Sequence, residues 1–314
     1  MKALLLFPIL LALASCTSKE KKTETDGSVV TTIGMIADVT REIAGDKQEV
    51  TNIIGEGVDP HSYIPTKSDI ESIQKAGLVL YNGYLLEGKM GSLLEGRRKD
   101  KNPVAAVAED LEGVKIIGDG DHPDPHLWMD VAIWSKTAAN ISKQLSSFDS
   151  ENADEYEKRL KSYQAQLATL NDYAIKAFKT IPADQRVLVT AHDAFSYLGR
   201  AYGIEVRGIQ GISTESEAGT KEVNDLVDYL VTQKIPAIFV ESSIADKSVR
   251  AVIEGAAQQG HTVTIGGTLF SDAMGPAGTY EGTYLGMMDH NITTIVRALG
   301  GTAPEQGFQN KLGQ

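Results

Sequence analysis

Cysteine is almost absent from this chain of 314 residues, because Cys16 is the only one. A single cysteine excludes an intramolecular disulfide, and its place near the N-terminus excludes thiolate catalysis in the folded body. Basic residues are also few, with 30 Lys and Arg against 42 Asp and Glu. This balance argues against nucleic acid as a partner, since a nucleic-acid binder would carry a basic patch, and it suits a protein that handles cations.

Long apolar runs are absent beyond the N-terminus, and the run at residues 3–14 is too short to cross a bilayer. It leads into residues 13–16, LASC, which resemble the lipobox of bacterial lipoproteins, where the cysteine is acylated. We therefore expect a signal peptide at 1–15, a lipidated polar tether at 16–28, and an extracytoplasmic body held at a membrane by lipid on Cys16. The alternative is an ordinary secretory signal with a spare cysteine.

Glycine and proline are missing from residues 151–180, where apolar residues recur at spacings of three and four. This pattern predicts one helix, roughly 45 Å long at 1.5 Å per residue, capped by Asp149 or Ser150 and stopped by Pro182. Both flanks alternate short apolar strands with helices. We predict an α/β fold of two lobes, each a mostly parallel sheet flanked by helices, joined by one long rigid helix. The expected boundaries are 29–148, 149–181 and 182–314; the alternative is a single domain with a long surface helix.

Strands and helices alternate in both predicted lobes, which implies parallel pairing with ligands bound at the carboxyl ends of the strands. In the first lobe the strands are expected at residues 28–34, 50–54, 78–81 and 114–117, and the helices at 36–44, 67–75 and 131–145. In the second lobe the strands are expected at 186–190, 204–209, 237–240 and 262–265, and the helices up to 202 and at 222–233, 249–259 and 283–299. The tail from Gly300 is expected to fray.

The tripeptide Asp-Pro-His occurs twice, ending at His61 and at His126, each time after a predicted strand. Asp59 and Asp124 are placed to orient these rings by accepting their second N–H.

His192 and Asp272 follow predicted strands of the second lobe. Three imidazoles and one carboxylate suit a four-coordinate divalent metal such as zinc. We therefore predict that His61, His126, His192 and Asp272 form a metal site in the cleft between the lobes.

Four segments carry a resemblance to a known family: GVDPHSYIPTKSDI at 57–70, DPHLWMD at 124–130, TAHDAFSYLGRAYG at 190–203 and LFSDAMG at 269–275. The chain resembles the ZnuA/TroA-like solute-binding lipoproteins of zinc and manganese ABC importers over about residues 29–299. The resemblance implies two α/β lobes joined by a single long helix, and Zn²⁺ or Mn²⁺ as the transported ligand. It also implies a membrane permease with its ATPase as partners, and it places the four ligands at the positions named above. We expect a monomer.

Two features bear on the metal. His192 resembles the branch of the family with three His and one Asp, and not the branch with glutamate there, which is associated with manganese. Many zinc-specialised members carry a long histidine-rich loop before the second ligand, whereas the loop at 118–125 is short and contains only His122. Zinc and manganese therefore both remain open.

Two other functions compete with metal transport. In a zinc hydrolase, Glu241 or Asp193 would act as general base beside a metal-bound water, but four protein ligands leave little room for that water and no His-Glu-x-x-His motif is present. A larger solute would call for aromatic stackers, whereas Trp128 and Trp134 are expected in the core. We therefore expect no enzyme. Asp193 is a candidate to support a ligand ring, and Glu241 is expected either to support a ligand ring or to pair with a buried cation. His122, His261 and His290 are expected on the surface or in packing contacts.

Overall fold

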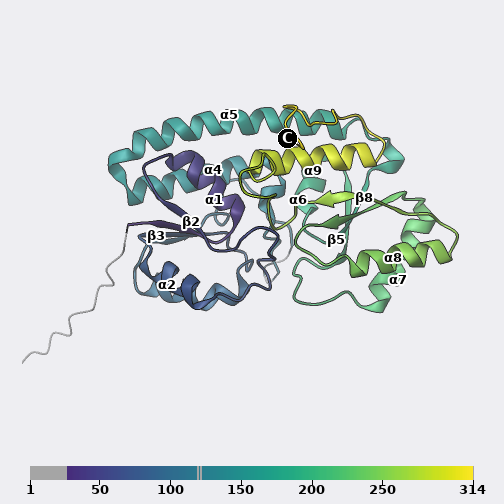
Figure 1. Ribbon diagram of the computed structural model, residues 1–314, viewed down its shortest axis with the longest axis horizontal. Coiled ribbons are helices and arrows are strands. Elements are labelled where there is room, and N and C mark those ends of the chain that lie inside the picture. The colour runs from purple at the N-terminus through teal and green to yellow at the C-terminus, as the bar shows by residue number, and fades with distance from the viewer. Residues whose placement is uncertain (1–26, 119, 121, 314) are drawn as a thin grey trace, which may run out of the picture.

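A computed structural model describes residues 27–118, 120 and 122–313. The predicted signal peptide, Cys16 and most of the predicted tether lie outside the described residues. Two α/β lobes lie side by side, and one long helix, α5 (Ala153–Phe178), runs across both (Figure 1). The predicted fold class is confirmed. Within the described ranges, no helix has the length and apolar character that a membrane span requires.

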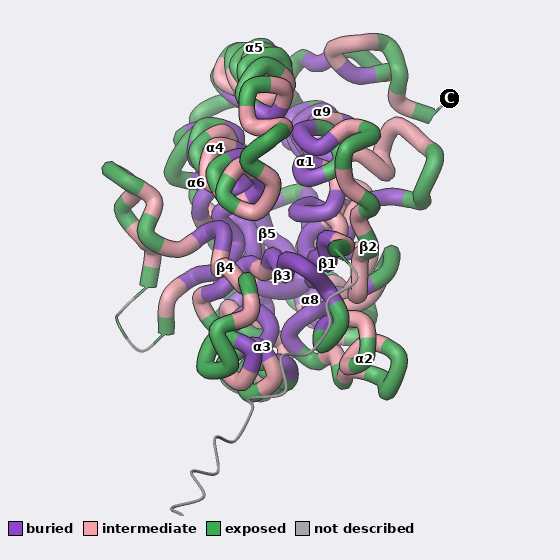
Figure 2. The backbone as a smooth tube through the Cα atoms, turned by 90° about the vertical axis from the view of Figure 1, so that its left-hand side faces the viewer, coloured by how far each residue is buried: buried purple, intermediate pink, exposed green. Residues whose placement is uncertain are grey.

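The first lobe is built on a four-stranded parallel sheet in the order β2-β1-β3-β4. Leu78, Val79 and Leu80 of β3 are all buried, as expected for a parallel strand covered on both faces. In Figure 2 the sheet lies between α1 and α4 on one side and α2 and α3 on the other. The elements are β1 (Val29–Thr31), α1 (Gly34–Ala44), β2 (Val50–Asn52), α2 (Lys67–Lys75), β3 (Leu78–Tyr81), α3 (Gly91–Lys99), β4 (Val104–Ala106) and α4 (Val131–Phe148).

The fourth strand is not where the sequence predicts it. Residues 114–117 form no strand; the fourth strand is β4, three partly buried residues that follow Pro103. Ile116 and Ile117 instead pack against the hydrophobic core from an extended loop, and the Ile117 N–H donates to the Tyr197 hydroxyl of the other lobe at 3.1 Å. An apolar run needs burial, and a loop across a core supplies it as well as a sheet does. His126 therefore follows a loop and not a strand.

The second lobe contains two parallel pairs, β5 with β6 and β7 with β8, and β5 lies beside β7. Helices α7 and α8 pack together, while α9 packs against β8 and α5 (Figure 1). The elements are β5 (Val187–His192), α6 (Ser196–Tyr202), β6 (Glu205–Gln210), α7 (Thr220–Gln233), β7 (Ala237–Glu241), α8 (Lys247–Gln258), β8 (Thr264–Leu269) and α9 (Tyr284–Ala298).

Helix α5 buries one apolar face against α1 and α4 of the first lobe and α9 of the second. The predicted cap is wrong: a 3-10 turn (Ser150–Asn152) precedes the helix, and Asn152 at its N-cap makes no side-chain capping bond. The Asp149 carboxylate instead accepts the Tyr156 hydroxyl at 2.6 Å, which ties the preceding loop to the first turns of the helix.

One hydrophobic cluster extends across both lobes, and a second cluster lies within the second lobe. Trp128 and Trp134 are fully buried, as predicted, and Trp134 stacks on Tyr284 of α9 with ring centroids 5.4 Å apart. The Trp128 indole donates to the Ser271 carbonyl at 2.8 Å, and the Tyr284 hydroxyl donates to the Trp128 carbonyl at 2.7 Å. The contact between the lobes is therefore packed and hydrogen-bonded, and not a flexible linker.

The prediction of a frayed tail is wrong. Phe308 stacks on Tyr173 of α5 with ring centroids 5.2 Å apart, and its N–H donates to Asp289 of α9 at 3.1 Å. The aromatic side chain of Phe308 packs the tail against the body of the protein. The prediction was wrong because the tail is otherwise rich in polar residues and glycine.

Candidate metal centre

Four buried side chains converge where the two lobes meet. His61, His126, His192 and Asp272 each offer one potential ligand atom, and these atoms all lie within 4.8 Å of one another. His61 and His126 come from loops of the first lobe, His192 is the last residue of β5, and Asp272 follows β8. The structure thus brings together, from both lobes, the four residues that the sequence singles out.

Both Asp-Pro-His tripeptides form the same local turn. The Asp59 carboxylate accepts the His61 N–H, and the Asp124 carboxylate accepts the His126 N–H, each at 2.9 Å. An aspartate that accepts the N–H two residues on is a common turn, and the intervening proline stiffens it.

Only the second aspartate also orients a ring. Asp124 Oδ1 lies 2.8 Å from Nδ1 of His126, whereas Asp59 uses its other oxygen to accept the hydroxyls of Ser62 and Thr214. The prediction that both aspartates hold a ring is therefore met at Asp124 and wrong at Asp59, whose tripeptide lies in a more exposed loop.

Glu241 holds the third imidazole. At the end of β7, beside β5, its Oε2 lies 2.5 Å from Nδ1 of His192, and its Oε1 accepts the His192 N–H at 2.9 Å. A carboxylate on Nδ1 leaves Nε2 free to face a metal, the usual arrangement around metal-ligating histidines. Asp193, the other candidate supporter, accepts the Ser196 hydroxyl at 2.7 Å at the start of α6 instead.

The centre of the cluster holds polar atoms that lack hydrogen bonds. Within the described residues, Nε2 of His192 and both carboxylate oxygens of Asp272 are buried without a hydrogen-bond partner. The Asp272 oxygens lie 3.3 Å from Nε2 of His126 and 3.2 Å from Nε2 of His192. Because buried polar atoms are nearly always satisfied, such a cluster suits a cation that all of them contact.

The electrostatics of the cluster favour bound positive charge. Burial lowers the pKa of His61 to about 4. Burial also opposes protonation of His126, but the neighbouring carboxylates of Asp124 and Asp272 outweigh this and raise its pKa to about 9. For Asp272, burial favours the neutral acid, yet the neighbouring His192 and His126 hold its pKa well below the usual range. A divalent ion bound at this cluster would replace protons, because metal ligands must be deprotonated.

A buried network that the sequence analysis missed supports the His126 loop. Asn82, after β3, donates from Nδ2 to the Pro125 carbonyl at 3.0 Å. Glu87 accepts the Asn82 N–H at 2.6 Å and the Thr32 hydroxyl at 2.7 Å. The Asn-Gly pair at 82–83 indicates a turn, but nothing in its sequence indicates that the turn holds a loop more than 40 residues away.

Comparison with known proteins decides the family. Residues 29–298 match the family described as ZnuA, zinc-uptake complex component A periplasmic. The chain belongs to this family.

The relatives extend along almost the whole chain. The manganese-binding lipoprotein MntA of Bacillus subtilis (strain 168) is 45% identical over 292 residues, covering 92% of this chain and 95% of MntA. The zinc-binding protein TroA of Treponema pallidum (strain Nichols) is 45% identical over 283 residues, covering 90% and 92%. The solved structure of periplasmic zinc-binding TroA from T. pallidum matches with a TM-score of 0.85 and 46% identity, covering 87% of this chain and 99% of TroA.

MntA and TroA are named as metal-binding proteins, and the hydrolase alternative finds no support in these names. The contacts of its two proposed general bases agree with this outcome. Glu241 is engaged by both the ring and the backbone of His192, and Asp193 by Ser196. Membership of the ZnuA family and the four converging side chains thus both indicate a metal-binding protein.

Proposed function

We propose that this protein is the solute-binding component of an ABC importer, which captures Zn²⁺ or Mn²⁺ between its lobes and delivers the ion to a membrane permease with its ATPase. The observation that carries the proposal is the set of four buried donor atoms within 4.8 Å of one another, from His61, His126, His192 and Asp272. Asp124 and Glu241 orient two of the rings. The protein catalyses no reaction, since four protein ligands leave little room for a metal-bound water.

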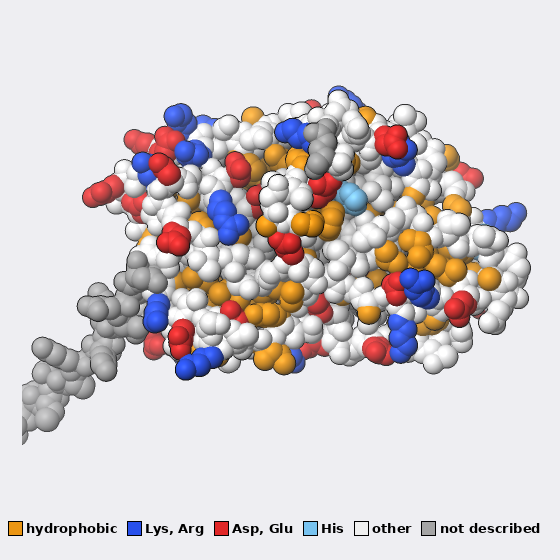
Figure 3. Space-filling model, viewed as in Figure 1, with side chains coloured by type: hydrophobic (Ala, Val, Ile, Leu, Met, Phe, Trp, Pro, Cys, Tyr) orange, Lys and Arg blue, Asp and Glu red, His pale blue; other side chains and the backbone are white. Residues whose placement is uncertain are grey.

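The same proposal implies where the protein is located. The relative MntA is named a lipoprotein, and residues 13–16 read LASC, so Cys16 carries the lipid and the lobes work outside the cytoplasm. The protein acts as a monomer with lobes at about 29–148 and 182–314. On the face drawn in Figure 3, Lys and Arg are interspersed with Asp and Glu and form no basic patch, which fits a protein without a nucleic-acid partner.

Metal content and competitive titration test this function. Wild-type protein should hold one Zn²⁺ or Mn²⁺ per chain, and both His192→Ala and Asp272→Ala should lose or weaken it. His261→Ala is the matched control, because that imidazole lies outside the cluster and contacts the Ile235 carbonyl. Absence of tight metal binding, or equal binding by all three variants, would refute the proposal.

The same titration ranks the two metals. Three imidazoles and one carboxylate bind zinc more tightly than manganese by intrinsic preference. The relatives include proteins named for each metal at the same 45% identity. We expect tighter binding of Zn²⁺ in vitro, with the metal carried in the cell set also by availability.

A further inference from the structure

The first ligand loop is tied directly to the second lobe at a point other than the ligands. Asp59, two residues before His61, accepts the hydroxyl of Thr214 at 2.6 Å through the oxygen that also accepts the Ser62 hydroxyl. Its other oxygen accepts the His61 N–H. One carboxylate therefore joins the backbone of a metal ligand in the first lobe to a side chain 155 positions away in the second.

Thr214 lies in the loop at 211–219, which connects β6 to α7 and is mostly exposed. This loop leaves β6 directly after Gln210, the partner of His192 in the parallel pair β5 and β6. A cavity of about 420 Å³, with Asp59, Thr214 and Ser243 in its lining, borders the contact. The loop at 211–219 therefore begins beside His192, contacts the loop that carries His61, and borders a cavity.

A second contact joins the same two regions. Lys89, in the short 3-10 helix Gly88–Met90, forms an ion pair of 2.7 Å with Glu215, the neighbour of Thr214. Both side chains are about half exposed, at 51% and 49%, so solvent screens this pair and its contribution is small. A hydroxyl that donates to a partly buried carboxylate is the stronger of the two contacts.

His61 differs from the other two histidines in how it is held. The rings of His126 and His192 are fixed by Asp124 and Glu241, whereas within the described chain no carboxylate is hydrogen-bonded to the ring of His61. Residues 124–128 around His126 are all buried, while Glu56, Gly57 and Ser62 around His61 are exposed. His61 therefore depends on its loop for its position more than the other two histidines do.

We propose that Asp59 and Thr214 form a latch that holds the His61 loop against the second lobe and so sets the rate at which bound metal leaves. Both are positioning residues: Asp59 acts on His61 through the backbone, and Thr214 acts through Asp59. The inference rests on the proposed metal-binding function. It adds that release begins at His61, with the other three ligands held in place.

The test is the rate of Zn²⁺ release from the full chain into an excess of chelator, followed by stopped flow, together with the association rate. Thr214→Val removes the hydroxyl and keeps the shape, and it should speed release about tenfold while leaving association unchanged, since one charge-assisted hydrogen bond is lost. Thr214→Ser restores the donor and should release at the wild-type rate. Thr169→Val, which removes an exposed hydroxyl on α5, is the matched control.

A double-mutant cycle makes the test specific. Asp59→Asn should also speed release, and adding Thr214→Val to it should change little, because the two side chains act as one unit. If Thr214→Val binds one Zn²⁺ per chain and releases it at the wild-type rate, the latch is refuted and the proposed function still stands. Equal acceleration by Thr214→Ser and Thr214→Val would also overturn it. Absence of bound Zn²⁺ in the wild type would refute the proposed function itself, and the latch with it.

Discussion

Single carboxylates decide how each part of the metal centre is held. Asp124 and Glu241 each bind an Nδ1 and a backbone N–H of the same histidine, so ring and backbone are fixed together. Asp59 also accepts the backbone N–H of its histidine, but its other oxygen accepts the hydroxyl of Thr214 in the second lobe. Three similar acidic residues therefore have two different roles, and only their surroundings distinguish them.

We expect Glu241→Gln to weaken metal binding by about 10- to 100-fold, the usual effect of removing a carboxylate partner from a ligating histidine. The physical reason is that the neutral amide no longer favours the His192 tautomer with Nδ1 protonated and Nε2 free. Competitive titration with a chelator measures the change. Asp193→Asn is the control, because Asp193 contacts Ser196 and should leave affinity near wild type. An equal loss in both variants would contradict the role given to Glu241.

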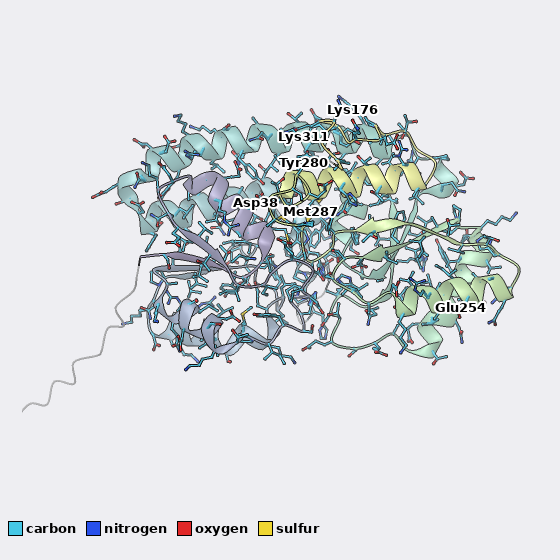
Figure 4. The ribbon with its side chains drawn as sticks, in the orientation of Figure 1. Asp38, Lys176, Glu254, Tyr280, Met287 and Lys311 are labelled. Carbon is cyan, nitrogen blue, oxygen red and sulfur yellow. The ribbon has the colours of Figure 1, made fainter. Side chains whose placement is uncertain are left out.

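Asp38 has a different effect, on stability. It lies on α1 near the start of α9 (Figure 4), and its carboxylate accepts the Tyr284 N–H at 2.9 Å. Burial raises its pKa from 3.8 to about 6, against the hydrogen bond, which lowers it. An acid with a raised pKa binds its proton more tightly in the folded state, so its charged form destabilises the fold in full above pH 6, and this penalty declines as the pH falls from about 6 to the ordinary pKa of 3.8.

We therefore expect Asp38→Asn to be more stable than wild type at pH 8, by about 1 to 3 kcal/mol, with the difference shrinking as the pH falls from about 6 and approaching zero below the ordinary pKa of 3.8. The amide oxygen still accepts the Tyr284 N–H, so the contact survives while the charge is removed. Urea unfolding at several pH values measures the free energy of unfolding. Asp46→Asn, an exposed aspartate with 83% of its side chain accessible, should show no such pH dependence. A destabilised Asp38→Asn at pH 8 would contradict this account.

At the scale of elements, α5 is the part that both lobes use. Its buried side chains recur every three or four positions, and they contact α1 and α4 at one end and α9 at the other. The tail adds a further contact through Phe308 on Tyr173. The helix is therefore held along its whole length by packing and not only by its own hydrogen bonds.

Leu170→Ala should lower the free energy of unfolding by about 2 to 5 kcal/mol, because it removes a fully buried side chain and leaves a cavity. Thr169→Ala, next to it on the exposed side, should change stability by less than about 0.5 kcal/mol. Chemical denaturation measures both. Similar effects at the two positions would mean that α5 does not bury its apolar face as described.

At the scale of the whole molecule, the shared core limits how far the lobes can move. Trp128 joins the loop after Leu269 and the start of α9, and α5 packs on both lobes. A wide hinge rotation would expose these buried aromatic residues to water, at a cost of several kcal/mol. Metal release by a local change at one ligand loop avoids that cost.

We expect small-angle scattering to give the same radius of gyration for metal-free and Zn²⁺-loaded protein. The same preparations should differ in thermal stability, because a ligand that binds only the folded state stabilises it by about 2.7 kcal/mol at 100 times its Kd. Asp272→Asn should lose that stabilisation while keeping the radius of gyration. Rotation of the lobes by tens of degrees on metal loss would contradict the rigid arrangement.

Much of this was predictable from the sequence because it is encoded locally. The bounds of α2 and β3 agree with the predicted ranges, since hydrophobic periodicity and capping residues act within one element. The prediction of a strand at 114–117 was wrong because these apolar residues pack against the core from a loop. The supporting role of Asn82 and Glu87 was not predicted, because their hydrogen bonds join segments far apart in sequence.

The sequence by itself determined the two lobes, the helix between them, and the identity of the four converging side chains, because a repeated tripeptide and a resemblance to a family mark them. Only the tertiary structure decided which carboxylate serves which ring. Asp59 and Asp124 stand in the same tripeptide, yet one faces a buried ring and the other a threonine of the opposite lobe. Hydrogen-bond partners depend on distances between residues far apart in the chain, and those distances exist only once the chain has folded.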